Sequence, residues 1–307
     1  MTDTTEISQQ SARKDEIDAL LKGAIDLHCH SGPAAMPRIL DHHEATMDAE
    51  GAGFRALLFK DHYYLGTPHC VMLEKLIPGL GVKLFSGIAL NNASGGINPH
   101  AVDHAIRMGA RIVWMPTLSA ANHIEKSASE TKNFPKSDKP MLPAIPLTVL
   151  DANGRLTDDT KQVLDLVAAG DIILAGGHLH VSEQLVMFDE ARRRGVTKMM
   201  VNHPTYVIDC SDEDIRSLVS MGVAMEHSIC MFVEGRAHKY DPDKLAHLIS
   251  LAGVDNTILS SDLGLTGSPW PLEGFRAIVG QLLDLQFSSA QIRTLVGDNA
   301  ARMLNMN

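Results

Sequence analysis

Residues 25–30 read Ile-Asp-Leu-His-Cys-His, a short apolar run that ends in two histidines separated by one residue. Side chains on a β-strand alternate between its two faces, so His28 and His30 point to one side and Cys29 to the other. Two imidazoles that face the same way can chelate a metal ion. The pair predicts a metal site at a strand end, although His-x-His is more often ordinary polar surface.

Seven further apolar runs have the length and composition of buried strands. They are residues 56–59, 82–90, 111–115, 171–175, 199–201, 223–225 and 257–260. Segments with helical spacing alternate with them at 41–52, 99–108, 158–169, 182–194, 211–221 and 242–251, and two more helices close the chain. Eight such units predict an α/β fold of the (β/α)8 TIM-barrel type, whose active sites lie at the strand carboxyl ends. A doubly wound sheet is the competing architecture, but its ligands gather at one switch point.

Two segments fall outside this alternation. Residues 1–22 predict an N-terminal extension, frayed at its start, with a short helix over Asp15 to Lys22, and residues 23–307 form the barrel domain. Residues 118–159, after the fourth strand, predict a long loop with a small hairpin around Asn153-Gly154. This insertion is either a disordered surface loop or a lid over the site.

The composition allows one large core and argues against a nucleic-acid partner. Of the 307 residues 45% are hydrophobic, enough for one large core. The net charge of −10, with Lys and Arg scattered, argues against a nucleic-acid partner. We find no targeting or membrane-spanning segment and expect a soluble cytoplasmic protein with no membrane partner, for which a homo-oligomer is plausible. The four cysteines lie far apart in the sequence, which suits reduced thiols better than a set of disulfides.

The predicted strand ends collect one set of candidate metal ligands. These are His28, His30, Lys60, His178, His203 and Asp262. Imidazole nitrogens together with a carboxylate oxygen suit zinc first, with manganese, iron or nickel as alternatives. Any one strand-end histidine could simply cap a backbone carbonyl. Because barrel closure makes the first and last strands neighbours, we expect the whole set to form one site.

In this pattern the chain resembles the amidohydrolase superfamily of metal-dependent hydrolases, over residues 25–304. In that superfamily His-x-His ends strand one, single histidines end strands five and six, and an aspartate ends strand eight. Residues 297–304 are also similar to its closing helix. One departure is that strand four lacks the superfamily's bridging lysine or glutamate and ends Trp114-Met115-Pro116-Thr117. Lys60 is the nearest substitute, and Asp61-His62 is similar to the second motif of PHP-domain phosphoesterases.

The resemblance implies one or two divalent metal ions per chain and hydrolysis of an amide, lactam or lactone bond in a small molecule. The metal would activate a water, and Asp262 would accept its proton. A mononuclear decarboxylase or C–C bond lyase is the alternative, a PHP-like phosphoesterase is a further one, and a non-catalytic metal-binding protein is a third class. Activity tests and metal stoichiometry separate these classes.

Four more residues are predicted to contact substrate: His62, His180, Glu226 and His227. His180 is also the alternative to His178 as a ligand, which we favour less, and Glu226 and His227 could equally form a satisfied polar rim. Lys60 has three predicted roles, as a carbamylated bridge between metals, which we favour, as a cation that holds a substrate carboxylate, or as an outward structural lysine. Arg38 and Arg155 could meet a carboxylate, but we expect both to be solvated surface arginines.

Overall fold

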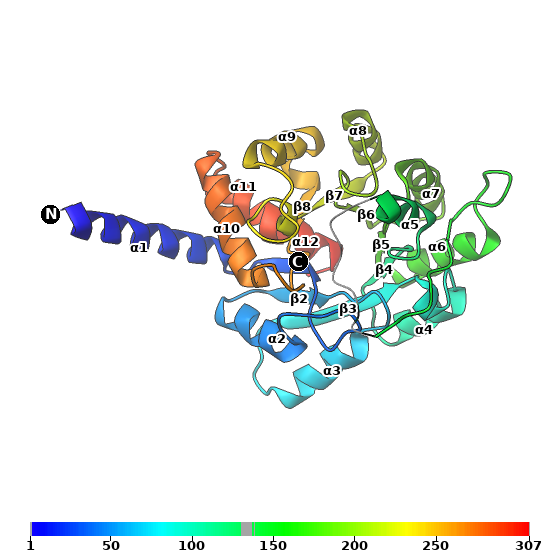
Figure 1. The fold of residues 1–307 in the computed structure, drawn as a ribbon, viewed down its shortest axis with the longest axis horizontal. Coiled ribbons are helices and arrows are strands. Elements are labelled where there is room, and N and C mark those ends of the chain that lie inside the picture. Colours follow the sequence, from blue (N-terminus) through cyan, green and yellow to red (C-terminus); the bar gives the residue numbers. More distant parts are fainter. Residues whose placement is uncertain (1, 130–136, 138, 307) are drawn as a thin grey trace.

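The eight predicted strands form one parallel sheet that closes into a barrel (Figure 1). The structure, a computed structural model, describes residues 2–129, 137 and 139–306. Strands pair in chain order. They are β1 (Ile25–Cys29), β2 (Ala56–Phe59), β3 (Lys83–Ala89), β4 (Ile112–Trp114), β5 (Ile173–Ala175), β6 (Met199–Asn202), β7 (Val223–Ser228) and β8 (Thr257–Ser260). The end of β8 returns to β1 where Asp262 N donates to His28 O at 2.7 Å and His30 N donates to Leu263 O at 2.9 Å. The predicted (β/α)8 barrel is confirmed.

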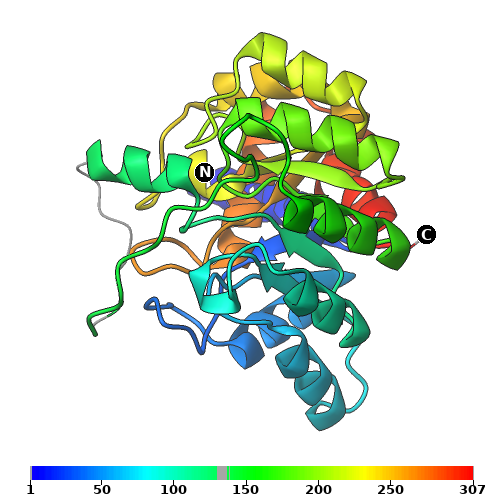
Figure 2. The ribbon, with the colours of Figure 1, turned by 90° about the vertical axis from the view of Figure 1, so that its right-hand side faces the viewer.

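Helices surround the barrel, as the two ribbon views show (Figures 1 and 2). They are α2 (His42–Gly51), α3 (Thr67–Leu76), α4 (Pro99–Arg107), α6 (Asp158–Gly170), α7 (Val181–Arg193), α8 (Asp212–Ser220), α9 (Pro242–Ala252), α10 (Pro271–Asp284), α11 (Ser289–Arg293) and α12 (Asn299–Met303). Ser211 is the N-cap of α8 and forms a capping box with Asp214. None of the described helices combines the length and the apolar character needed to cross a lipid bilayer.

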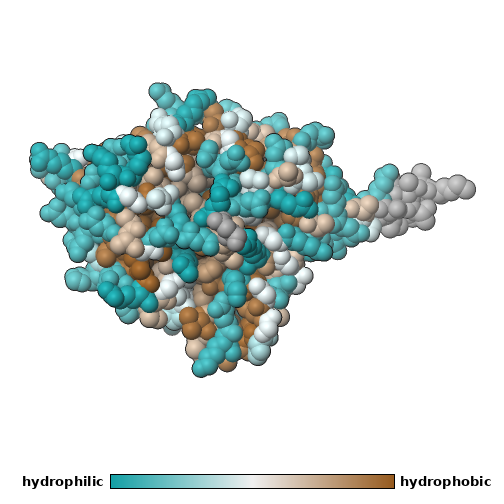
Figure 3. Space-filling view, turned by 180° about the vertical axis from the view of Figure 1, so that it is seen from behind, coloured by the Kyte–Doolittle hydropathy of each residue, from teal (hydrophilic) through white to brown (hydrophobic). Residues whose placement is uncertain are grey.

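The barrel has an inner and an outer hydrophobic core. The inner core fills the barrel with side chains such as Leu27, Leu58 and Trp114. The outer core lies between the strands and the surrounding helices and includes Cys29, Leu57 and Phe59. Seen from behind, much of the surface is hydrophilic, with hydrophobic residues interspersed (Figure 3).

A β-bulge in β1 changes which side chains face the inside of the barrel. Asp26 pairs with Leu57 and Cys29 with Phe59, so β1 has one residue more than β2 between these pairs. Ile25 and Leu27 belong to the inner core, yet the next residue, His28, also points inward. The bulge therefore lets β1 place apolar residues in the barrel and histidines at its mouth.

The N-terminal helix is longer than predicted. Instead of a short helix over residues 15–22, α1 spans Thr2–Leu21 and projects from the barrel (Figure 1). Its C-terminal half is held on α10, where Arg13 Nη2 donates to Gly280 O at 2.9 Å and Arg276 pairs with Asp18 at 2.7 Å. These contacts join residues more than 250 positions apart in sequence, which local patterns do not reveal.

The insertion after β4 contains a helix that the sequence analysis missed. This helix, α5 (Ala121–Ser129), lies on the same side of the barrel as the loops that follow β1 and β8 (Figure 2). The predicted hairpin is present as an antiparallel bridge between Leu150 and Leu156. Of the polar stretch 126–140, residues 130–136 and 138 lie outside the described residues, and its role as a lid stays a prediction.

Candidate metal centre

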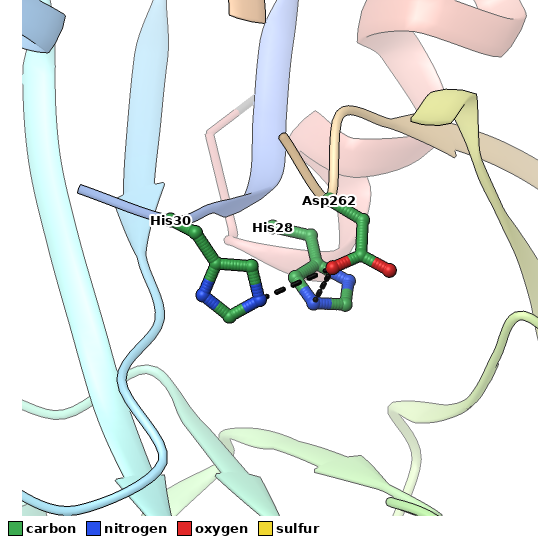
Figure 4. A group of neighbouring side chains, drawn as sticks. All are labelled: His28, His30 and Asp262. Carbon is green, nitrogen blue, oxygen red and sulfur yellow. Dashed lines mark ion pairs between the residues drawn. The ribbon is translucent and has the colours of Figure 1, made fainter. Parts of the chain in front are cut away.

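His28, His30 and Asp262 converge at the mouth of the barrel (Figure 4). Asp262 Oδ1 lies 3.1 Å from the Nε2 atoms of both histidines. One ligand atom from each residue lies within 4.8 Å of the others. Two ligands on a tetrahedral ion are roughly 3.4 Å apart when each bond is about 2.1 Å. The donor set therefore fits a divalent cation.

Two of the predicted ligands have a left-handed backbone, which is uncommon for residues other than glycine. The φ angle is 32° at His203 and 48° at Asp262. Gly264 follows at φ 115°, and a Cβ atom there would lie 1.5 Å from His30 O. Only glycine fits at this contact, so the segment after β8 can pack directly against the end of β1. Strained backbone of this kind concentrates at functional sites.

Five histidines form a ring around the mouth: His28, His30, His62, His178 and His203. Successive ring centroids are 5.1 Å apart for His28 and His30, 5.2 Å for His30 and His62, 6.2 Å for His62 and His178, 5.0 Å for His178 and His203, and 6.3 Å for His203 and His28. All five side chains are buried. The structure thus brings together the four predicted histidine ligands and His62.

Each of these rings has its Nδ1 atom engaged by a neighbouring group. The partners are Glu226 Oε2 for His28 at 3.2 Å, Lys60 O for His30 at 2.9 Å, Thr117 Oγ1 for His62 at 2.8 Å, His123 Nδ1 for His178 at 2.9 Å, and Tyr206 O for His203 at 3.3 Å. Where the partner is a carboxylate or a carbonyl oxygen, Nδ1 carries the hydrogen. When a metal is bound, Nε2 would then be the lone-pair nitrogen that coordinates it.

Lys60 lies inside this group. Its Nζ atom is 3.0 Å from His28 Nε2 and 5.4 Å from the centroid of the Trp114 ring, and the side chain is buried. The predicted role as an outward structural lysine is therefore wrong. Trp114 occupies the barrel interior at the end of β4, where the sequence analysis found no bridging ligand.

Charge is unevenly distributed around the ring. Burial opposes the charge of Asp262, but His28 and His30 outweigh it and hold the pKa of this carboxyl well below its usual range. Burial also opposes a proton on His28, yet Asp262 and Glu226 raise its pKa to about 9. Burial lowers the pKa of His30 to about 3 and that of His178 well below its usual value. The carboxylates thus favour positive charge next to His28, where a metal would lie.

Three residues that are predicted to contact substrate are not part of the ring of histidines. Glu226 is beneath His28, because β7 continues to Ser228 and residue 226 is deeper in the barrel than predicted. There it accepts from Asn202 Nδ2 at 2.5 Å and from Ser228 Oγ at 3.2 Å. His227 faces the opposite side of β7, where burial lowers its pKa to about 4. His180 is the N-cap of α7, and its ring accepts from Ser182 N. All three lie outside the ring of histidines, and substrate contact by these residues stays a prediction.

Several residues that support the site were missed. His123, on α5, holds His178, and Asn122 beside it donates to His178 O at 3.0 Å. Asp26 Oδ1 accepts from His28 N and Ser261 N, both at 2.9 Å, and so ties the bulge to β8. Asp61, the first residue of the PHP-like pair, bonds Arg38 and Tyr63 N rather than the ring. Of these supporting residues, only Asp26 has a signal in the sequence, because it stands two residues before His28.

Comparisons with known structures show the same fold. An amidohydrolase from Pseudomonas aeruginosa matches with a TM-score of 0.64 at 11% identity, covering 95% of this chain and 98% of that one. A probable dipeptidase, PvdM, from the same organism gives 0.65 at 12% identity, covering 95% and 97%. A mutant PTE-like lactonase from Deinococcus radiodurans gives 0.56 at 13% identity, covering 93% and 97%. The resemblance to amidohydrolase-type barrels is thus confirmed for the fold.

The sequence itself places the chain in one family. A search of curated protein sequences finds no match. Residues 23–226, more than half of the chain, match a family of unknown function and include every predicted ligand except Asp262. The chain therefore belongs to the family of unknown function DUF6282.

Proposed function

We propose that this chain is a metal-dependent hydrolase of the amidohydrolase type that cleaves an amide, lactam or lactone bond in a small molecule. The observation that supports it best is the approach of the Nε2 atoms of His28 and His30 to one oxygen of Asp262 while both Nδ1 atoms are bonded to other groups. Such a preorganised set of nitrogen and oxygen donors suits a divalent metal, zinc first. The shared fold of hydrolase structures agrees with it.

The residues divide into those that would hold the metal and those that would act on substrate. His28, His30 and Asp262 would hold one ion, and Lys60, His178 and His203 are proposed to hold a second. When bound, the metal would lower the pKa of a water and polarise a carbonyl group. Asp262 keeps its charge and, with 17% of its side chain exposed, can accept the proton of the attacking water. His62 faces the same space and would contact substrate.

Lys60 is proposed to carry the bridge that β4 lacks. Its amine would add to carbon dioxide, forming an N–C bond with loss of one proton, and the resulting carbamate would bring a negative charge between the two metal positions. The contact with His28 Nε2 supports this placement. In the competing role Lys60 stays cationic and holds a substrate carboxylate.

A mononuclear decarboxylase or C–C bond lyase is the second candidate. It is favoured by Trp114, a bulky apolar side chain at the end of β4, where a bridging ligand would be expected in a binuclear centre. About one tightly bound ion per chain, with carbon dioxide as the product, would support this candidate against hydrolysis.

The test of the proposed function combines metal analysis with a substrate panel. The metal-replete protein is assayed against lactones, lactams, N-acyl amino acids and dipeptides, and its metal content is measured by mass spectrometry. Hydrolysis that disappears with chelation and returns with zinc supports the proposal. Metal binding without turnover of any panel member contradicts it and revives the lyase or a non-catalytic role.

A further inference from the structure

Arg38 is a buried arginine beside the metal centre, contrary to the solvated residue predicted from the sequence. Its side chain is 3% exposed. The loop that carries it follows β1, and Arg38 forms an antiparallel bridge with Leu265, three residues after Asp262. Ile39 N also donates to Gly264 O at 2.9 Å. The loop is thus attached to the segment that supplies Asp262.

The guanidinium group of Arg38 is only partly satisfied. Nη2 lies 3.3 Å from Asp61 Oδ2, a single and rather long ion pair. Among the described residues, Nε and Nη1 have no hydrogen-bond partner, although both atoms are buried. Buried donors without partners are costly, and a guanidinium offers a planar fork of donors that matches a carboxylate. The unused part of this fork is suited to an anion.

Arg38 lies next to the chain segment that carries Lys60 and beside an open hollow. Asp61, its ion-pair partner, directly follows Lys60 in sequence. An open hollow of about 470 Å³ runs along the loop after β1, and its lining includes Arg38, Asp41 and Glu44 but none of the predicted metal ligands. A small molecule therefore has room beside this loop.

We propose that Arg38 binds a carboxylate of the substrate, so that this hydrolase acts on small amides, lactams or lactones with a free acid group near the scissile bond. The inference rests on the proposed function. Asp61 holds one edge of the guanidinium through Nη2, and the remaining donors receive the carboxylate. Recognition by a fork of this kind is bidentate, so lysine at this position would keep the charge and lose the geometry.

The experiment compares Arg38→Gln with wild type on paired substrates. Each pair consists of an N-acyl amino acid and the corresponding N-acyl amine that lacks the carboxylate. We expect the variant to raise KM for the acid about 10- to 100-fold, as for loss of a hydrogen bond to a charged group, and to leave the amine and the metal content unchanged. Arg38→Lys should recover only part of the loss. An equal fall for both substrates would overturn the inference.

Two further variants serve as controls for this experiment. Arg155→Gln changes the other arginine considered from the sequence, which is exposed, and should leave both substrates unaffected. Arg38→Gln leaves Asp61 buried without its partner, so the double variant Arg38→Gln/Asp61→Asn removes both charges and should fold if the single variant does not. The double variant must show the same selective loss for the acid.

A binding measurement separates this inference from the proposed function. Calorimetry with succinate and with uncharged succinamide measures anion recognition without any reaction. Succinate binding that Arg38→Gln removes supports the inference even if no panel member is hydrolysed. Hydrolysis of neutral amides together with equal binding of succinate by both proteins overturns the inference and leaves the proposed function intact. Preference for inorganic phosphate over succinate would also overturn it and favour a phosphoester substrate.

Discussion

The mouth of the barrel has two unlike halves. In the half around β1, His28 and His30 contact charged groups from β7, β8 and β2, namely Glu226, Asp262 and Lys60. At β5 and β6, His178 and His203 contact each other and His123, and burial lowers the pKa of all three. The first half attracts a cation by charge, whereas the second offers neutral nitrogens. We therefore expect the first half to bind metal more tightly and to carry most of the catalysis.

Asp262→Asn should have the largest effect. The substitution removes both the anionic ligand and the proton acceptor, and general acid–base groups contribute about 10²- to 10⁴-fold to rate. We expect kcat to fall by that range, measured together with metal content. Asp243→Asn, at an exposed position on α9, is the control. Turnover near the wild-type value with metal retained would exclude Asp262 as the base.

Lys60→Ala tests whether the two halves share a bridge. If Lys60 is carbamylated, activity should fall about 100-fold with loss of metal, and acetate or propionate should restore part of it. Lys22→Ala, at an exposed site, should change nothing. Loss of substrate affinity with full metal content would instead assign Lys60 a cationic role and count against a binuclear centre.

Glu226→Gln tests the carboxylate beneath the first half. Removing the charge that holds His28 Nδ1 should lower metal affinity about 10- to 100-fold, the usual effect of changing a group that orients a metal ligand. Competition with a chromophoric chelator measures it, with Glu213→Gln as the exposed control. Unchanged affinity would mean that His28 is positioned without Glu226.

His123→Ala makes the corresponding change in the second half. His178 loses its Nδ1 partner, but no charge is removed, so metal affinity should fall by about tenfold. The same chelator assay applies, and His104→Ala on the exposed face of α4 is the control. If His123→Ala costs more than Glu226→Gln, the second half holds the tighter site and the comparison is reversed.

His227 provides the smallest and most local prediction, on the outer side of the barrel. Its pKa falls to about 4 in the folded protein, so the unfolded chain takes up a proton between about pH 6.5 and 4 that the folded chain does not. The contribution of His227 to the free energy of unfolding is therefore complete above pH 6.5 and is lost as the pH falls toward 4. This residue changes the free energy of unfolding by at most about 1.4 kcal/mol per pH unit. When denaturant unfolding is measured at several pH values, the free energy of unfolding of His227→Asn should depend less steeply on pH than that of the wild type. The control variant His100→Asn should show the wild-type dependence.

The sequence predicted the strands because each is a short apolar run with few alternatives. Most bounds agree within one or two residues, and β2 and β8 agree at both ends. The six predicted ligands gather at one mouth because the carboxyl ends of all strands in a closed barrel meet at one rim. The failures depend on contacts between distant residues. Glu226 was misplaced because β7 extends past its apolar part, and α5 was missed in a polar insertion.

Burial of polar side chains was the least predictable property. Arg38 and His123 lie in loop or insertion segments whose local sequence resembles solvent-exposed chain. They are buried because the loop after β1 pairs with the segment after β8 and because α5 contacts the end of β5. Neither pairing has a local signal, so the role of these residues follows only from the closed barrel.

The bulge in β1 has a consequence for comparing relatives of this chain. Below it, odd-numbered residues face the barrel interior, and above it even-numbered residues do. The alternation of inward and outward residues along β1 is therefore interrupted at Leu27. If a relative without the extra residue were aligned to this chain by its apolar positions, its histidines would be misaligned by one residue. In evolutionary terms, loss of the codon for Leu27 would restore regular alternation and keep both imidazoles at the mouth, whereas loss of the codon for His28 would leave only one there.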